Sequence, residues 1–131
     1  MTNTIAQEFM AQLPANVMAA QCPSRTILGH LTSRWGVLVM IALLTGTHRF
    51  SVLRRRIGGV SERMLAQTLQ QLEADGFVRR VALDVVPPHV EYSLTPLGEE
   101  AAHHVAALAQ WVETALPRIL QHDQRNSIRK Y

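Results

Sequence analysis

Residues 49–80 read RFSVLRRRIGGVSERMLAQTLQQLEADGFVRR, and this stretch decides the fold. It predicts two amphipathic helices separated by a turn at Gly58 and Gly59. The first helix is short, and its apolar face consists of Phe50, Leu53 and Ile57. The second helix has Ser61 as its N-cap, ends at Gly76 and carries a buried stripe of leucines at positions 65, 69 and 72. Two adjacent helices of this kind form a helix-turn-helix.

The excess positive charge of the chain lies in the same region. Between residues 48 and 80, seven arginines stand against three acidic residues, whereas the rest of the chain has a net charge of −1. An arginine run such as the one at residues 54–56 is, on its own, most often a solvated helix face. The second helix, however, presents Arg63, Gln67 and Gln70 opposite its leucines, and these side chains can form hydrogen bonds with the edges of DNA bases. A polyanion is therefore the expected partner.

The segment before this region predicts an arm and two helices. Residues 1–21 contain a weak helical pattern that is broken by Pro14, so we expect an arm that cannot form a core alone. Pro23 suits the first position of a helix, with Cys22 as its cap. Residues 35–44 (WGVLVMIALL) are apolar all round, which predicts a central helix that is buried on every side.

A hairpin and a long helix are expected after the helix-turn-helix. Residues 77–83 are rich in β-branched side chains and residues 90–94 alternate apolar and polar side chains, which predicts two paired strands. Two prolines exclude the connection at 84–89 from the ladder, so the hairpin is expected to project as a wing. Thr95 and Pro96 then supply the cap and the first position of the long helix.

The long helix predicts a dimer. Its apolar residues are spaced 4, 3, 4, 3 and 4 apart, and they are Ala101, Val105, Leu108, Val112, Ala115 and Ile119. A seam with this spacing requires a partner helix, and a second copy of the chain supplies one. Pro117 is expected to kink this helix or to end its first part.

These elements predict a single domain over residues 1–131, because a chain of this length is too short for two independent cores. Its class is mainly α with a small β-hairpin (α+β), arranged as a winged helix-turn-helix. The expected parts are an N-terminal arm at 1–21, a DNA-binding core at 22–95 with its wing at 77–95, a dimerisation helix at 96–122 and a tail at 123–131.

Composition and motifs exclude several other classes. No apolar run reaches the roughly 18 residues of a membrane span, and the first residues carry Glu8 without lysine or arginine, so neither a membrane protein nor a secretion signal is expected. A single cysteine excludes an internal disulfide and fits a reducing compartment, so the expected location is the cytoplasm. The histidines are scattered and no phosphate-binding loop occurs, so we expect no enzyme, no metal and no cofactor.

Five strings of residues carry a resemblance to a known family. They are CP at 22–23, RW at 34–35, RFSVLRRRI at 49–57, GGVSERMLAQTLQQLEADGFVRR at 58–80 and VPPHVEYSLTPLGEE at 86–100. In their order and spacing over residues 22–111, they resemble the HxlR family of bacterial transcription regulators. The resemblance implies a homodimer that binds a palindromic operator in double-stranded DNA, usually as a repressor and sometimes as an activator.

The resemblance also implies roles for individual residues, since members of the family place the second helix of the motif in the major groove and the wing against the minor groove. The residues carried over by position are the groove contacts Ser61, Arg63, Met64 and Gln67, the phosphate contacts Arg49 and Arg54, and the wing-tip contact His89. Family wings often carry arginine in place of His89, so a contact with the DNA backbone alone is the alternative for this wing.

The sequence leaves two effectors open. A lone cysteine is by default a small buried side chain, but Cys22 precedes a helix, where backbone N–H groups lower the pKa of a thiol, and Arg25 lies within about one turn. Redox-sensing members of the family carry cysteine at this Cys-Pro position, which implies an oxidant-sensing thiol. A small molecule at the dimer interface, near Trp35, Met40 and Trp111, is the alternative effector. A winged helix used only for protein contacts is a further alternative, and such modules usually lose the arginine excess that this chain retains.

Overall fold

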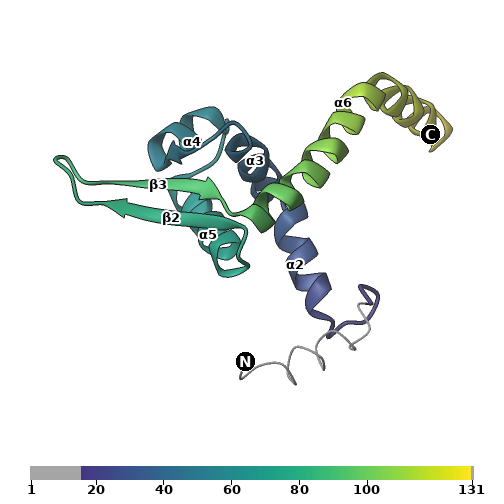
Figure 1. Ribbon diagram of the computed structural model, residues 1–131. Coiled ribbons are helices and arrows are strands. Elements are labelled where there is room, and N and C mark those ends of the chain that lie inside the picture. The colour runs from purple at the N-terminus through teal and green to yellow at the C-terminus, as the bar shows by residue number, and fades with distance from the viewer. Residues whose placement is uncertain (1–15, 131) are drawn as a thin grey trace.

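The computed structural model describes residues 16–130, with side chains up to His122 (Figure 1). The helices within this range are α2 (Pro23–Thr32), α3 (Arg34–Leu43), α4 (Phe50–Arg56), α5 (Glu62–Ala74) and α6 (Pro96–Lys130). The strands are β1 (His48–Arg49), β2 (Val78–Leu83) and β3 (His89–Leu94). A mainly helical fold with a small antiparallel sheet confirms the predicted class. Most of the arm expected at residues 1–21 lies outside the described residues.

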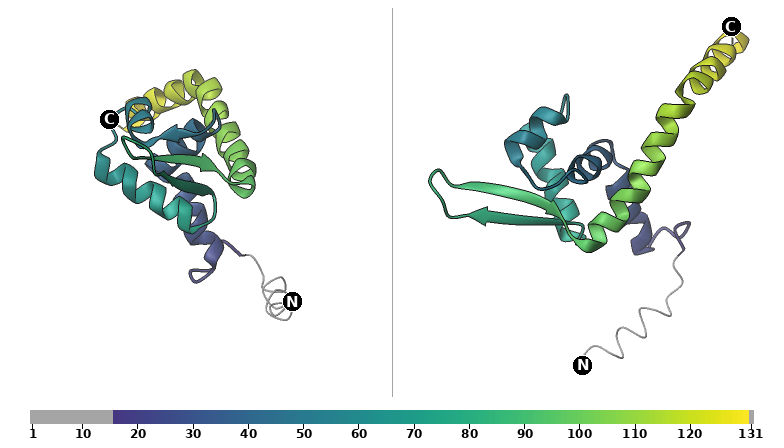
Figure 2. Two further views of the ribbon diagram at one scale, coloured as in Figure 1. Left: turned by 60° about the vertical axis from the view of Figure 1, so that its left-hand side comes forward. Right: turned by 45° about the horizontal axis from the view of Figure 1, so that its top comes forward.

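The sheet forms because β3 pairs with a strand on each side. Its order is β1-β3-β2, both pairs are antiparallel, and the register of the hairpin runs from Val78 opposite Leu94 to Leu83 opposite His89. The hairpin confirms the predicted wing, which projects away from the helices in Figures 1 and 2. The sequence does not predict β1, because two residues carry no alternating pattern and this strand exists only through its pairing with β3.

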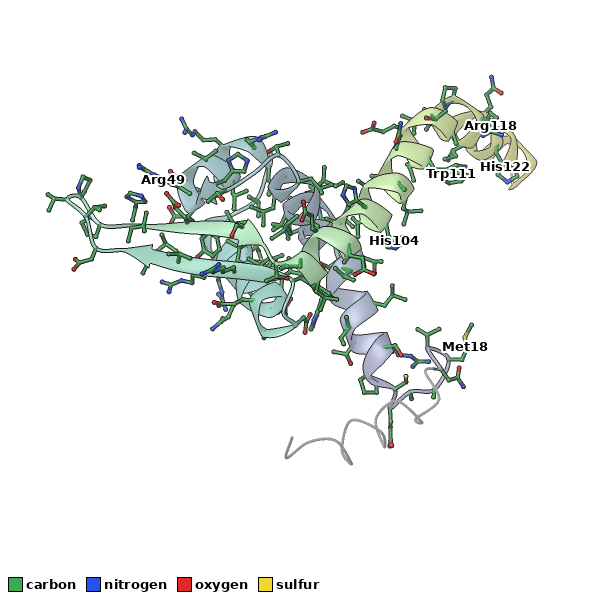
Figure 3. The ribbon with its side chains drawn as sticks, viewed as in Figure 1. Met18, Arg49, His104, Trp111, Arg118 and His122 are labelled. Carbon is green, nitrogen blue, oxygen red and sulfur yellow. The ribbon has the colours of Figure 1, made fainter. Side chains whose placement is uncertain are left out.

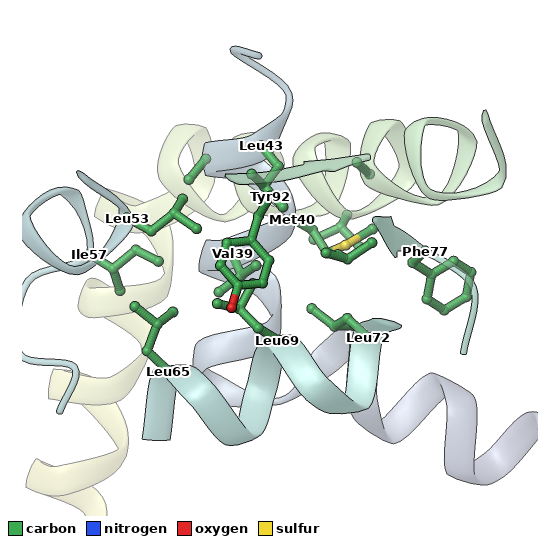
Figure 4. Packing of buried hydrophobic residues seen from close by; sticks show 14 of the residues in the cluster. Val39, Met40, Leu43, Leu53, Ile57, Leu65, Leu69, Leu72, Phe77 and Tyr92 are labelled. Atoms are coloured by element: carbon green, nitrogen blue, oxygen red, sulfur yellow. The ribbon is translucent and has the colours of Figure 1, made fainter. Parts of the chain in front are cut away.

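The core lies where α3, α5 and the sheet meet (Figure 4). Its largest fully buried side chains are Val39, Met40, Leu53, Leu65, Leu69 and Leu72. The leucine stripe predicted for α5 is therefore confirmed, and α3 is the helix against which it packs. Each of these side chains contributes about 1.5–3 kcal/mol to folding by leaving water.

The prediction that the central helix is buried on every side is wrong. The buried residues of α3 recur at helical spacing on one side, at Gly36, Val39, Met40 and Leu43, with Ala42 beside them. On the other side Leu38 is 40% exposed. The reason is that α2, α5 and α6, which pack against α3, cover only part of its circumference, and an all-apolar sequence does not say which part.

A tight joint connects the end of α5, the base of the wing and the start of α6. The hydroxyl of Thr95 donates to the carbonyl of Gly76 and accepts from Gly98 N–H at 2.9 Å, so Thr95 caps α6 as predicted. The backbone N–H of Thr95 also donates to the carbonyl of Phe77 at 3.0 Å. A Cβ added at Gly98 would collide with the backbone of Phe77, so only glycine allows this close approach.

Helix α6 continues through Pro117 to Lys130, so the prediction that it ends at residue 122 is wrong. Its axis nevertheless bends in its second half, where Pro117 lies (Figure 1). Proline lacks an N–H group and crowds the carbonyl one turn earlier, which favours a bend rather than an end when the flanking residues are good helix formers.

The predicted seam of α6 is covered mainly in its first part, and in its second part only Ala115 is buried among the described residues. Ala102 and Val105 are buried, and α6 packs against α3. Further along the helix, the large apolar side chains are exposed in the single chain, and they include Leu108, Trp111, Val112, Leu116, Ile119 and Leu120. Apart from Ala115, the second part of the seam is therefore exposed within the described residues.

No single helix in the described part of the chain has both the length and the apolar character needed to cross a membrane. Only α2 and α3 taken together reach that length, and they meet at an angle of 72°. Nor do three or more histidine, cysteine, aspartate or glutamate side chains gather anywhere among the described residues as they would around a metal ion.

Candidate DNA-binding surface

Helix α5 presents a polar face to solvent, opposite its buried leucines. Ser61 caps the helix, because its Oγ accepts a hydrogen bond from Met64 N–H at 3.1 Å. The four predicted groove contacts are exposed and lie at the cap or in the first two turns, and they are Ser61, Arg63, Met64 and Gln67. Arg63 can donate two hydrogen bonds to a guanine edge, Gln67 can exchange two with adenine, and Met64 offers an apolar contact to a thymine methyl group.

Arg54 belongs to the same surface. Its Nη1 lies 3.0 Å from Oε1 of Glu62, in the first turn of α5. Both side chains are well exposed, so the ion pair contributes at most about 1 kcal/mol to stability, but it holds Arg54 beside the start of α5. The neighbouring Arg56 is engaged elsewhere, because its Nη1 donates to Oγ1 of Thr45 at 2.9 Å.

Arg49 and His89 form a second group, on the sheet. Arg49 (Figure 3) lies opposite Glu91 in the β1–β3 register. Nε2 of His89 lies 3.4 Å from a carboxylate oxygen of the same Glu91. The side chain of His89 is only 19% exposed, and its residue begins β3 rather than occupying the tip of the wing. The loop at the tip, residues 84–88, instead exposes Asp84 and Val86 and contains no basic residue. No hydrogen bond or ion pair joins this group to the α5 surface among the described residues.

Two hollows flank α5, and each contains an arginine that the sequence pattern does not single out. The hollow between α3 and α5 has a volume of about 370 Å³ and is lined by Ser33, Arg34, Trp35, Met64, Gln67, Thr68 and Gln71. The hollow between α5 and the sheet has a volume of about 430 Å³ and is lined by Ala66, Gln70, Glu73, Arg80 and Tyr92. The alternation of side chains along β2 could have predicted that Arg80 shares a face with the buried Val78. No sequence pattern indicates that Arg34 lies beside α5.

Cys22 is the N-cap residue of α2 and is partly buried. Its Sγ lies 2.7 Å from Oγ of Ser24, and this hydrogen bond is the main reason why the pKa of the thiol is lowered. Backbone N–H groups at the start of the helix lower this pKa further, whereas burial opposes the change. Arg25 does not take the expected part in stabilising a thiolate, because its guanidinium donates to the carbonyls of Val17 and Met18, at 3.1 and 2.7 Å.

The residues predicted to line a small-molecule pocket do not lie together. Met40 is fully buried in the core, Trp35 lines the hollow between α3 and α5, and Trp111 is 57% exposed on α6 (Figure 3). Trp111 borders a separate open hollow on α6, which neither Trp35 nor Met40 reaches. Within one chain, the described residues therefore give no common pocket for this effector.

The helix-turn-helix, the wing and the exposed polar face of α5 together define a winged-helix DNA-binding protein. Residues 30–120 match the family described as HxlR-like helix-turn-helix, and this chain belongs to that family. The chain is accordingly a helix-turn-helix transcriptional regulator and not an enzyme. The family suggested by the five sequence strings is confirmed.

Individual relatives agree with this assignment. The chain is 68% identical over 105 residues to the uncharacterized HTH-type transcriptional regulator YtfH of Escherichia coli (strain K12), which covers 80% of this chain and 83% of that protein. The structure of the transcriptional regulator ytfH from Salmonella typhimurium is similar, with a TM-score of 0.82 and 63% identity over 85% of this chain and 99% of that chain. The redox regulator HypR in its oxidized form has a TM-score of 0.65 and 35% identity, over 71% of this chain and 96% of that one.

Replacing Ser24 by alanine removes the hydroxyl that most lowers the pKa of Cys22. We expect the pH midpoint for alkylation of Cys22 by iodoacetamide to rise, because a weaker acid needs a higher pH to form the reactive thiolate. Near neutral pH the variant should react more slowly, and well above both pKa values the rates should converge. Thr32→Ala, which removes a hydroxyl bonded to the carbonyl of Leu28 on the same helix, is the matched control. An unchanged midpoint in Ser24→Ala would contradict the assigned cause.

Proposed function

We propose that this protein is a cytoplasmic, homodimeric repressor that binds a palindromic operator in double-stranded DNA, with α5 of each subunit in the major groove. The outward face of α5 carries the proposal. Arg63, Gln67 and Gln70 lie in solvent opposite the leucines that fix the helix in the core. Among the described residues, none of these three side chains has a hydrogen bond or an ion pair, so all are available to a partner.

The dimensions of the helix support this mode of binding. An α-helix with its side chains is about 10–12 Å across, and the major groove of B-form DNA is about 12 Å wide. With α5 in the groove, the proposed contacts with base edges are Ser61, Arg63, Met64 and Gln67. Arg49 and Arg54 are the proposed phosphate contacts. His89, partly buried beside Glu91, contacts the DNA backbone from the wing rather than entering the minor groove.

Replacing Arg63 by alanine should cost about 1–3 kcal/mol of binding to the operator and much less on mixed-sequence DNA, because a base-edge contact carries sequence information. Gln67→Ala should behave in the same way. Arg54→Ala is the control, since losing a phosphate contact should weaken binding to both DNAs alike and flatten the salt dependence. The operator can be selected from random-sequence duplexes with the wild-type protein, and affinities measured by fluorescence anisotropy at fixed salt. An operator affinity unchanged by Arg63→Ala would rule out the groove assignment.

The exposed part of the α6 seam supports the dimer. Leu108, Val112 and Ile119 keep the predicted spacing and are exposed in the single chain, and Trp111 and Leu116 widen the apolar stripe. Apolar surface contributes about 25 cal/mol per Å² when it leaves water, so two such stripes favour association. A two-fold dimer presents two equivalent recognition helices, and this symmetry is what a palindromic operator matches.

Light scattering at micromolar concentration should give about twice the chain mass of 14.6 kDa. Leu108→Glu should shift the protein toward the monomer, because dimerisation would bury an unpaired carboxylate in an apolar seam. Gln110→Glu adds the same charge at an exposed polar position of α6 and should leave the dimer intact. A monomeric wild type, or a Leu108→Glu variant that stays fully dimeric, would refute this interface.

Control of DNA binding by oxidation of Cys22 is the second part of the proposal. Three observations favour it: the lowered pKa of the thiol, its place at the start of α2, and the likeness to the redox regulator HypR. Helix α2 also offers a route to α5, because Nδ1 of His30 in its last turn donates to a carboxylate oxygen of Asp75 at 2.6 Å. Asp75 is the C-cap of α5, so a displacement of α2 would be felt by the recognition helix.

Diamide provides the test. It accepts two electrons and two protons when two Cys22 thiols form one disulfide between subunits, and this product should run as a dimer on non-reducing gels. We expect the operator affinity of the wild type to change on oxidation and to recover with dithiothreitol, whereas Cys22→Ser should not respond. Equal affinities of wild type and Cys22→Ser before and after diamide would leave Cys22 a packing residue.

A further inference from the structure

We propose that the protein grips duplex DNA on both flanks of α5, with the guanidinium groups of Arg34 and Arg80 each binding a backbone phosphate. The inference rests on the proposed insertion of α5 into the major groove. It adds two contacts outside the helix-turn-helix face, one from the start of α3 and one from the wing. Their role is to set how deeply and at what angle α5 enters the groove.

The position of the two hollows carries the inference. A helix that fills the major groove has one phosphate backbone along each of its flanks, since its diameter is close to the groove width. The hollows described above lie on these two flanks: one is bordered by Met64 and Gln71, the other by Ala66 and Glu73. Arg63, Gln67 and Gln70 lie on the arc of α5 between these borders, the side that would face the bases.

The hollow between α3 and α5 suits a phosphate well. The guanidinium of Arg34 lies over the ring of Trp35, 4.7 Å from its centroid, and this cation–π contact restrains a long side chain that is otherwise exposed. Among the described residues, no acidic side chain lines this hollow, whereas Gln71 adds an amide group that can donate. Arg34 has no ion pair among the described residues, so its charge is available to DNA.

The hollow on the wing side is weaker, because it contains both signs of charge. Arg80 stands opposite the buried Tyr92 in the β2–β3 register, on the sheet face that borders α5. The carboxylate of Glu73 lines the same hollow and opposes the approach of a phosphate. Arg34 should therefore contribute more to DNA affinity than Arg80, and neutralising Glu73 should strengthen binding.

The adjacent Arg79 supplies a matched control. It is exposed and carries the same charge on the same strand, but successive residues of a strand point to opposite faces, so it lies on the face away from α5. Replacing it tests whether any arginine lost from the wing weakens DNA binding through the general field of the protein.

The test uses the full-length protein and a 24-base-pair duplex of mixed sequence, with affinities measured by fluorescence anisotropy over a range of salt concentrations. We expect Arg34→Ala and Arg80→Ala to weaken binding, by about tenfold for Arg34 and less for Arg80, and each to reduce the slope of log affinity against log salt by about one. Arg79→Ala should change affinity by less than about twofold and leave the slope unchanged. Arg34→Lys should retain the slope, because it keeps the charge, and Glu73→Gln should tighten binding.

The outcomes separate this inference from the proposed function. If the wild type binds neither this duplex nor the selected operator at any salt concentration, the proposed function fails. If the wild type binds but Arg34→Ala and Arg80→Ala have the slope of the wild type or of Arg79→Ala, the proposed phosphate contacts of Arg34 and Arg80 are refuted while the proposed function stands. Circular dichroism of each variant shows whether it is folded. For an unfolded alanine variant, the glutamine substitution at the same position replaces it in the comparison, because glutamine also removes the charge.

Discussion

The burial of Leu65, Leu69 and Leu72 against α3 is the contact on which the rest of the structure depends, because it fixes the rotation of α5 about its own axis. Turning this helix by one residue, about 100°, would bring polar side chains into the core and expose leucines that each contribute about 1.5–3 kcal/mol when buried. The buried leucines therefore determine which side of α5 faces solvent, and that side is the polar face. The cap at Ser61 and the end of the helix before Gly76 fix its length in the same way.

Several of the basic side chains around α5 lie beside acidic ones. Arg54 pairs with Glu62, Glu91 lies beside both Arg49 and His89, and Glu73 shares a hollow with Arg80. Arg34 and Arg63 have no such neighbour among the described residues. The charge of these paired arginines is therefore partly neutralised locally, whereas that of Arg34 and Arg63 is not.

The parts of the fold that the sequence predicts are those with a local signal. The glycine pair at 58–59, the leucine period of α5 and the alternation at 90–94 each specify an element without reference to the rest of the chain. The exposed side of α3 has no such signal, because it depends on which neighbours pack where. For the candidate surface, Arg63 follows from its helix face, whereas Arg34 acquires its place only because α3 passes beside α5. The contact between His89 and Glu91 depends on the residue at which β3 begins, and the sequence of the wing does not indicate that residue.

The hydrogen bonds of Thr95 and the close approach of Gly98 to Phe77 connect the base of the wing rigidly to the first turn of α6. Within one subunit, the wing and the end of α5 therefore move together with the start of α6. In a dimer held by α6, the distance and the rotation between the two recognition helices are set by a continuous stiff path instead of a flexible linker. B-form DNA turns by about 35° per base pair, so one additional base pair between the half-sites rotates the second half-site away from its helix. Such a dimer would match one spacing of the half-sites better than a spacing that is longer by one base pair.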